Sequence, residues 1–257
     1  MTTGLKRSAG VANSFGIVLA AVAFLVILQA SQVYSVEALS KRATYGDHKW
    51  QPATDYDTDG CYPTAAVGKD GEAAGGLKTT GAIDGNCRDE SDLENTNSYC
   101  RTKCVGGWCA HFYAYYFEKD QTTHLGCSIC GHRHDMEHVI VWVENDVARF
   151  VSRSAHGKYY ARAIDDVRME DTHPKIVYHK EGAGTHVFRF ANKDDEPPEN
   201  HKGEWQYPTL RSWKLLPSKV RDKLNNHDFG SAKLDIKDDR FIDTLRRARP
   251  DEVPFDV

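Results

Sequence analysis

The sequence predicts a mainly β protein, with a β-sandwich core and peripheral helices. Three observations lead to this fold class. Twelve Tyr and ten Phe residues favour a β-rich fold over a helical bundle. Short stretches with the apolar pattern of strands recur from residue 108 to residue 190. Two helical patterns follow only near the C-terminus, and two stacked sheets are the simplest way to bury so many strands.

The N-terminal residues are not expected to belong to this core. Lys6 and Arg7 precede an uncharged apolar run over residues 15–28, and small residues follow. This order is typical of a secretory signal peptide, which we place at residues 1–35. An uncleaved membrane anchor is the alternative, but the run is shorter than the roughly 20 apolar residues of a membrane span. The sequence therefore predicts a secreted, extracellular protein.

A dibasic pair, Lys41-Arg42, follows this segment. We interpret residues 36–42 as a short pro-segment that a dibasic-cleaving secretory protease removes, which leaves a single domain over residues 43–257. The alternative is an ordinary exposed basic pair. Loss of the first 42 residues removes four basic side chains and one acidic one, so the formal net charge of −4 becomes −7. An acidic protein is a poor candidate for binding nucleic acid or anionic lipid through bulk charge.

Cysteine is confined to the first half of the predicted domain. A secretory signal makes disulfides the default state. The count is odd, so at least one thiol is free or is paired between chains. The seven residues are Cys61, Cys87, Cys100, Cys104, Cys109, Cys127 and Cys130.

The elements follow in order along the chain. Residues 43–107 are dense in turn-forming Asp and Gly and are predicted to form loops and short elements. A polar loop is expected at residues 193–203. Helices are predicted at residues 217–226 and 239–248, and Pro250 ends the second. The predicted strands cover residues 108–119, 138–144, 149–152, 159–163, 175–179 and 186–190.

One stretch, GHRHDMEHVIVW at residues 131–142, concentrates groups that can bind or react. Side chains alternate along a strand, so Asp135 and Glu137 share one face. The other face carries His134, Met136 and His138. His132 lies at the strand entrance, where its direction is free. Asp120 ends the preceding aromatic strand and can approach the two acids if the two strands pair.

Three carboxylates close together cannot all stay ionised without a cation. Oxygen ligands in this number favour a hard ion, Mg²⁺ or Ca²⁺, with His132 as a neighbour or a water-mediated ligand. Arg133 is an alternative source of neutralising charge. The competing interpretation is a salt-bridged turn at the end of a strand.

Two zinc sites are the sharper alternatives. His132-x-His134-Asp135-x-x-His138 is similar to the His-x-His-x-Asp-His pattern of metallohydrolases, in which zinc activates water, although the Asp is displaced by one position. Cys127-x-x-Cys130 with a nearby histidine would be a thiolate site. Secretion argues against it, because oxidised cysteines do not ligate metal.

The same stretch closely resembles GHRHDWEHVVVW, the signature of the necrosis- and ethylene-inducing-peptide-like proteins. These are secreted cytolytic toxins of plant-associated fungi, oomycetes and bacteria. Several further blocks resemble the family in the same order, and together they span nearly the whole mature chain. These blocks lie at residues 55–63, 76–78, 85–89, 114–121, 154–157, 173–179, 184–186 and 226–232.

The resemblance implies a β-sandwich similar to sea-anemone pore-forming toxins and fungal lectins. It implies a divalent-metal site on Asp120, His132, Asp135 and Glu137, and His186 matches a further cavity histidine. Arg133 and His134 of the signature are predicted to lie with the ligand-binding cavity. The family recognises glycosyl inositol phosphoryl ceramides of the plant plasma membrane, and membrane damage follows.

The resemblance also implies disulfides. Cys61 and Cys87 match a pair found across the family, and Cys104 and Cys109 match a pair seen in some members. Each such crosslink typically adds about 2–4 kcal/mol of stability. A bond between two of the remaining three cysteines, Cys100, Cys127 and Cys130, is left open, and a bond from Cys100 to either loop cysteine is one option.

Two departures from the family pattern bear on function. Met136 stands where the signature has Trp, so its face of the strand should pack differently. The loop after Asp120 carries two cysteines. The leading hypothesis is a secreted cytolysin rather than an enzyme. The alternatives are a non-toxic member that plant immune receptors detect as an elicitor and, less favoured, a metal-dependent hydrolase.

Overall fold

The computed structural model describes residues 1–2, 36–124 and 130–256. The predicted signal-peptide features and Cys127 lie outside these residues. Within the described part of the chain, no helix has the length and apolar character needed to cross a bilayer.

Two β-sheets form the core, which confirms the predicted fold class. The larger sheet has six strands in the order β10-β2-β3-β4-β5-β6. The smaller sheet has the order β1-β8-β7, with β9 paired to β8. The strands are β1 (Ala53–Tyr56), β2 (Ser98–Val105), β3 (Trp108–Gln121), β4 (Gly131–Glu144), β5 (Val147–Ala155), β6 (Lys158–Ala163), β7 (Met169–Glu170), β8 (His173–Lys180), β9 (His186–Phe190) and β10 (Leu210–Ser212).

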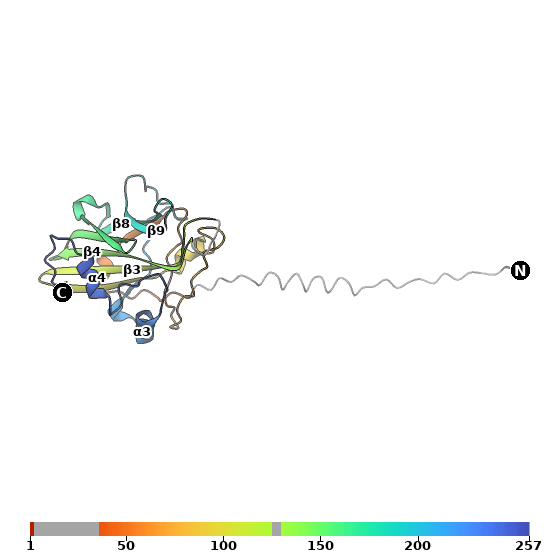
Figure 1. The fold of residues 1–257 in the computed structure, drawn as a ribbon, viewed down its shortest axis with the longest axis horizontal. Coiled ribbons are helices and arrows are strands. Elements are labelled where there is room, and N and C mark those ends of the chain that lie inside the picture. Colours follow the sequence, from red (N-terminus) through yellow and green to blue (C-terminus); the bar gives the residue numbers. More distant parts are fainter. Residues whose placement is uncertain (3–35, 125–129, 257) are drawn as a thin grey trace. The chain divides into compact units, whose positions relative to one another are not determined.

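Helices lie at the periphery. Figure 1 shows β8 and β9 on one side of the β3–β4 pair, with α3 on the opposite side. Among the described residues, the α-helices are α2 (Tyr45–Lys49), α3 (Ser218–Asn226) and α4 (Phe241–Ala248), and the 3₁₀ turns are η1 (Glu90–Glu94), η2 (Ile164–Asp166) and η3 (Trp213–Leu215).

Two apolar layers hold these parts together, because both faces of β3 and β4 are buried. Between the sheets, Phe117 of β3 stacks on Tyr178 of β8 with ring centroids 3.8 Å apart. On the other face, Phe112 packs edge-on against Phe241 of α4. A strand buried on both faces carries apolar residues at consecutive positions, which explains the continuous apolar run of β4.

The six predicted strands are all present, and five of them run further than expected. β4 begins at Gly131 rather than at residue 138, so the whole histidine-rich stretch is strand. The second C-terminal helix begins at Phe241 rather than at residue 239. Residues 43–107, predicted as loops and short elements, also contain the eight-residue strand β2.

Residues 36–42, predicted to be a pro-segment, pack on the domain. Leu39 is buried, and its backbone N–H and C=O are both hydrogen-bonded to the Asn97 side chain. The backbone of Arg42 pairs with Leu210 and Ser212 at the edge of the larger sheet. Cleavage after Arg42 stays a prediction, and it would remove a segment that the folded domain uses.

Disulfides join Cys61 to Cys87 and Cys104 to Cys109. Cys130 is also disulfide-bonded. Cys100 is free and buried in β2, so the bond from Cys100 to a loop cysteine that the sequence left open is not formed. The thiolate zinc site is also not supported, because an oxidised Cys130 offers no thiolate.

Candidate metal centre

The antiparallel β3–β4 pair brings the two ends of the predicted site together. The register places Asp120 of β3 directly opposite His132 of β4. A single donor atom from each of Asp120, His132 and Asp135 lies within 4.8 Å of those of the other two. Asp120 is 1% exposed and Asp135 is 6% exposed. Three of the four predicted ligands therefore meet at one point, with His132 on its more exposed side.

Glu137, the fourth predicted ligand, lines the same cavity from the next inward position of β4. Its carboxylate accepts a short hydrogen bond from the Ser154 hydroxyl. It stands beside the three-residue cluster and is not one of its members.

A local irregularity in the backbone of β4 reverses the alternation of side chains between the two faces of the strand. Strict alternation would place His132 and Asp135 on opposite faces. His134, which lies between them, has a φ of 60°, a left-handed conformation that is rare for a residue other than glycine. The reversal turns His132 to the side of Asp135. Such strain is typical of functional sites held by their surroundings.

The segment at Gly75–Gly76 packs against this reversal. The Arg133 guanidinium donates to the carbonyls of Gly75 and Gly76 at 2.9 and 3.1 Å. A Cβ on Gly76 would lie 2.6 Å from the His134 ring, so only glycine allows this close approach. The conformation of β4 therefore depends on a segment more than fifty residues away in the chain.

Arg133 and His134 are not among the residues that line this cavity. Arg133 is exposed and turns away to Gly75 and Gly76. His134 is buried on the helix side, where its Nδ1 lies 2.7 Å from Tyr116 Oη and its ring packs on Phe229. The reversal at His134 is the physical reason, because it separates these two side chains from His132.

The histidines of the zinc alternative also separate. His134 contacts Tyr116, and the His138 ring packs on Phe112 beside Tyr159. Neither belongs to the donor cluster around His132. The zinc-hydrolase pattern therefore has no counterpart in the geometry.

His132 is oriented for ligation. Its Nδ1–H donates to the His134 carbonyl at 2.6 Å, and its Nε2 lies 4.0 Å from Asp120 Oδ2. A backbone acceptor on one ring nitrogen fixes the tautomer and leaves a lone pair on the other, as in metal-bound histidines. Two carboxylates with one such imidazole suit a hard divalent cation.

The acidic groups carry the electrostatic signature of a site that attracts a cation. Burial, with the nearby Asp120 charge, raises the pKa of Asp135 to about 6. Burial and the Asp135 charge raise the pKa of Glu137 well above its usual range. Like charges in a buried space disfavour full ionisation, and a bound cation would relieve this repulsion.

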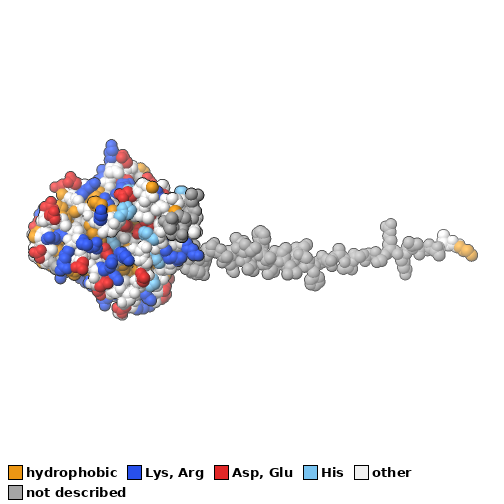
Figure 2. Space-filling view, in the orientation of Figure 1, with side chains coloured by type: hydrophobic (Ala, Val, Ile, Leu, Met, Phe, Trp, Pro, Cys, Tyr) orange, Lys and Arg blue, Asp and Glu red, His pale blue; other side chains and the backbone are white. Residues whose placement is uncertain are grey.

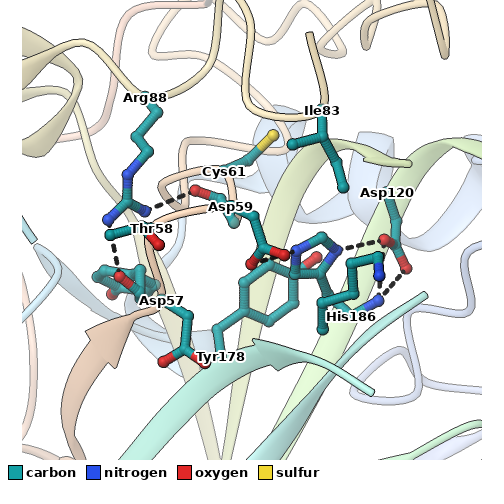
Figure 3. Close-up of polar contacts among 12 residues, drawn as sticks. Asp57, Thr58, Asp59, Cys61, Ile83, Arg88, Asp120, Tyr178 and His186 are labelled. Atoms are coloured by element: carbon teal, nitrogen blue, oxygen red, sulfur yellow. Dashed lines mark hydrogen bonds and ion pairs between the residues drawn. The ribbon is translucent and has the colours of Figure 1, made fainter. Parts of the chain in front are cut away.

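His186, the predicted cavity histidine, forms a link between the two sheets. Its Nδ1 donates to Asp120 Oδ1 at 2.7 Å, and its backbone N–H donates to the same carboxylate. Its Nε2 lies 3.4 Å from Asp59 Oδ1. Figure 3 shows the ring between Asp59 and Asp120, beside Tyr178. Burial alone would lower the pKa of His186, but these two acids raise it to about 9.

Sequence reasoning missed two residues of the site. Tyr178 of β8 donates to Asp135 Oδ2 at 2.8 Å and stacks on the His186 ring. Asp59 approaches from the loop after β1. Both lie in blocks that carry the family resemblance, which is the signal that could have pointed to them.

A cavity of about 230 Å³ opens beside the donor cluster. β5 pairs with β4 only from Val139 onward, so Met136 and His138 reach the cavity as well as the acids. Ser154 lines it, bonded to Glu137 and to the His138 N–H rather than to a histidine ring. Ligand pockets usually measure about 300–1,000 Å³, so this one can hold only part of a large molecule. The cavity is also lined by His156, Gly157, Tyr159, Ser231, Ala232, Lys233 and Asp235.

Comparison with known proteins gives a consistent picture. Residues 45–248 match the family described as "Necrosis inducing protein (NPP1)". NLP effector protein 3 of Phytophthora capsici is 34% identical over 200 residues, which is 75% of this chain and 78% of that protein.

Two solved structures share the fold. The non-toxic HaNLP3 protein matches with a TM-score of 0.71 and 27% identity, over 85% of this chain and 99% of that one. NLPPya in complex with glucosamine matches with a TM-score of 0.69 and 26% identity, over 84% of this chain and 96% of that one.

Proposed function

We propose a function for this chain from one premise: it belongs to the necrosis-inducing protein (NPP1) family. The chain is a secreted cytolysin that binds glycosylated sphingolipid head groups of the plant plasma membrane and damages that membrane. The observation that carries the proposal is the donor cluster of Asp120, His132 and Asp135, two buried carboxylates and a partly buried imidazole that line a small cavity.

In this proposal the cluster holds Mg²⁺ or Ca²⁺, with Glu137 beside it. A bound cation of this kind supplies coordination positions that sugar hydroxyl oxygens can fill. Neighbouring side chains hold these ligand groups in position. Tyr178 holds the Asp135 carboxylate, and His186 holds Asp120. The His132 backbone contact presents Nε2 to the cluster. The site binds a head group and needs no catalytic turnover.

A specific head group fits this protein better than general attraction to charged lipid. The formal net charge is −4, which opposes binding to an anionic surface. Figure 2 shows positive and negative side chains interspersed over the face in view, without a broad basic patch there. A structural relative was solved with glucosamine bound, which supports a sugar as the recognised part of the target.

The test is dye release from vesicles of phosphatidylcholine and sterol, with and without plant glycosyl inositol phosphoryl ceramide. We expect release only from the sphingolipid-containing vesicles, and loss of release in a chelator. Asp135→Asn should be inactive, whereas Glu144→Gln, at the opposite end of β4, should release dye like the wild type. Equal release from both kinds of vesicle would refute the proposal.

A non-toxic member of the family is the second candidate. Met136 lines the cavity at a signature position that differs from the family, and one relative of the same fold is described as non-toxic. Such a protein would act as an elicitor that plant immune receptors detect. Leaf infiltration distinguishes the two, because the elicitor triggers defence responses without lesions. Release of free sugar phosphate in the vesicle assay would instead favour the hydrolase.

A further inference from the structure

A second group of metal-ligating side chains lies far from the candidate metal centre. Asp47 of α2, Cys100 of β2 and His111 of β3 each offer a donor atom, and these three atoms lie within 4.8 Å of one another. His111 precedes Asp120 by nine residues on β3. At about 3.4 Å per residue, the two groups are roughly 30 Å apart along the strand.

All three side chains are buried: Asp47 is 3% exposed, Cys100 is 0% exposed and His111 is 6% exposed. His111 Nδ1 lies 3.3 Å from Asp47 Oδ1. The Thr102 hydroxyl donates to Asp47 Oδ1 at 2.6 Å, and the Ser212 hydroxyl donates to Oδ2. The Thr102 hydroxyl also lies 2.9 Å from His111 Nδ1, so a metal bound to that nitrogen would take the place of this contact.

The donor set is chemically distinct from that of the first site. One oxygen, one imidazole nitrogen and one sulfur form a mixed set that suits Zn²⁺, whose bonds to these atoms are about 2.0–2.3 Å long. Tetrahedral bonds of this length put donor atoms roughly 3.3–3.8 Å apart. The Asp47–His111 separation of 3.3 Å already has this value, and the cluster as a whole would contract from its present limit of 4.8 Å.

A metal ion can reach the three donor side chains through a cavity, and Cys100 is in the reduced form that metal binding requires. A cavity of about 590 Å³ is lined by all three residues and extends past Trp213 toward α3. It leaves room for water as a fourth ligand. Cys100 is unpaired although five of the six described cysteines are in disulfides. The thiolate is the form that binds metal, so binding displaces the Cys100 proton.

We propose that Asp47, Cys100 and His111 form a second, independent binding site for a borderline divalent cation, Zn²⁺, with water in the fourth position. Binding releases the Cys100 proton to solvent. The metal joins α2 to strands β2 and β3, so it stabilises the fold by crosslinking the N-terminal part of the domain to the larger sheet.

The test is titration of the purified chain with Co²⁺, after mass spectrometry confirms that Cys100 is reduced. Thiolate bound to Co²⁺ gives a charge-transfer absorption that oxygen and nitrogen ligands alone do not. We expect this absorption to saturate at one metal per chain and to disappear on addition of Zn²⁺. Asp135→Asn, which affects only the first site, should retain it.

Cys100→Ser and His111→Gln should each lose the absorption and weaken Zn²⁺ binding at least about 10–100-fold, the loss typical even for residues that only support a ligand. Absence of the absorption from the wild type overturns the proposal, as does Zn²⁺ binding that is unchanged in both variants. If either variant fails to fold, the ¹¹³Cd resonance of the wild-type complex reports directly whether sulfur is a ligand.

Discussion

His186 Nδ1 of the smaller sheet lies 2.7 Å from Asp120 Oδ1 of the larger sheet, and both side chains are almost fully buried. Tyr178 makes a second link of this kind to Asp135. Each carboxylate of the donor cluster is thus held by a residue of the opposite sheet. The candidate metal centre is consequently part of the interface between the sheets, and changes to it should alter both cation binding and stability.

Asp135→Asn should raise the stability of the metal-free protein and lower its affinity for the cation. Burial and the Asp120 charge disfavour an ionised Asp135, whose pKa is raised to about 6. Because the native state holds this proton more tightly than the unfolded chain, the charged form costs stability above pH 6. In chelator at pH 7.5, the variant should therefore be more stable by roughly 1–3 kcal/mol. Urea unfolding measures this difference.

The affinity of the same variant for Mg²⁺ or Ca²⁺ should fall at least about 10–100-fold, because a charged ligand is lost. Isothermal titration calorimetry measures it. Glu144→Gln is the matched control, since Glu144 lies on β4 in an exposed pair with Arg149 and should leave both properties unchanged. A variant that is less stable in chelator and binds cation normally would show that Asp135 is only structural.

The fold was predictable where burial follows directly from local pattern. The apolar runs of β3, β4 and β9 are buried on the faces that their patterns indicate. β1 was not predictable, because Thr54 and Asp55 are polar and fully buried. Apart from the contact between Thr54 and Tyr56, their side-chain partners come from residues 199–206, more than 140 positions away. No local pattern contains that information.

The candidate site likewise contains some residues whose position follows from local pattern and one whose position depends on distant contacts. The acids on one face of β4 follow from strand alternation, and the approach of Asp120 follows from the pairing of β3 with β4. The position of His132 does not, because it depends on the left-handed backbone of His134. That conformation is stabilised by contacts with Tyr116 and with the segment at Gly76. Alternation alone would have put His132 on the wrong side.

Met136→Trp tests the departure from the family signature. Met136 is 5% exposed and packs in the layer between the larger sheet and the helices. A larger ring at this position overpacks the layer, which typically costs about 1–3 kcal/mol. Chemical denaturation measures this cost. Met136→Leu, which conserves volume, is the control and should cost less than about 1.5 kcal/mol. If Trp is accommodated without loss, the cavity is larger or more adaptable than the structure indicates.

A protein that begins at residue 43 should be less stable than one that begins at residue 36. The longer form buries Leu39, worth about 2 kcal/mol, and keeps the backbone hydrogen bonds of Leu39 and Arg42, worth about 1 kcal/mol each. Thermal unfolding of the two proteins measures the difference. Leu39→Ala in the longer form should lose roughly 2–4 kcal/mol. N-terminal sequencing of the secreted protein then shows whether cleavage after Arg42 occurs.

Stability should also depend on pH through two acids that share Arg189. Burial raises the pKa of Asp57 to about 6 although Arg189 lies 3.4 Å away. The native state therefore binds a proton more tightly than the unfolded chain between about pH 4 and 6, and the contribution of Asp57 to stability falls as pH rises through that range. Asp57→Asn should match the wild type near pH 4 and exceed it above pH 6.

Asp195 is the matched control with the opposite sign. Burial alone would raise its pKa, but hydrogen bonds from Arg189 at 2.6 and 2.7 Å and from the Asn192 N–H lower it. Its stabilising contribution is present above its ordinary pKa of 3.8 and is lost only as pH falls below that value. Asp195→Asn should be less stable than the wild type by a constant amount from pH 7.5 to 4. Urea unfolding across this range separates the two acids, and parallel curves for both variants would contradict the assignment of the raised pKa to Asp57.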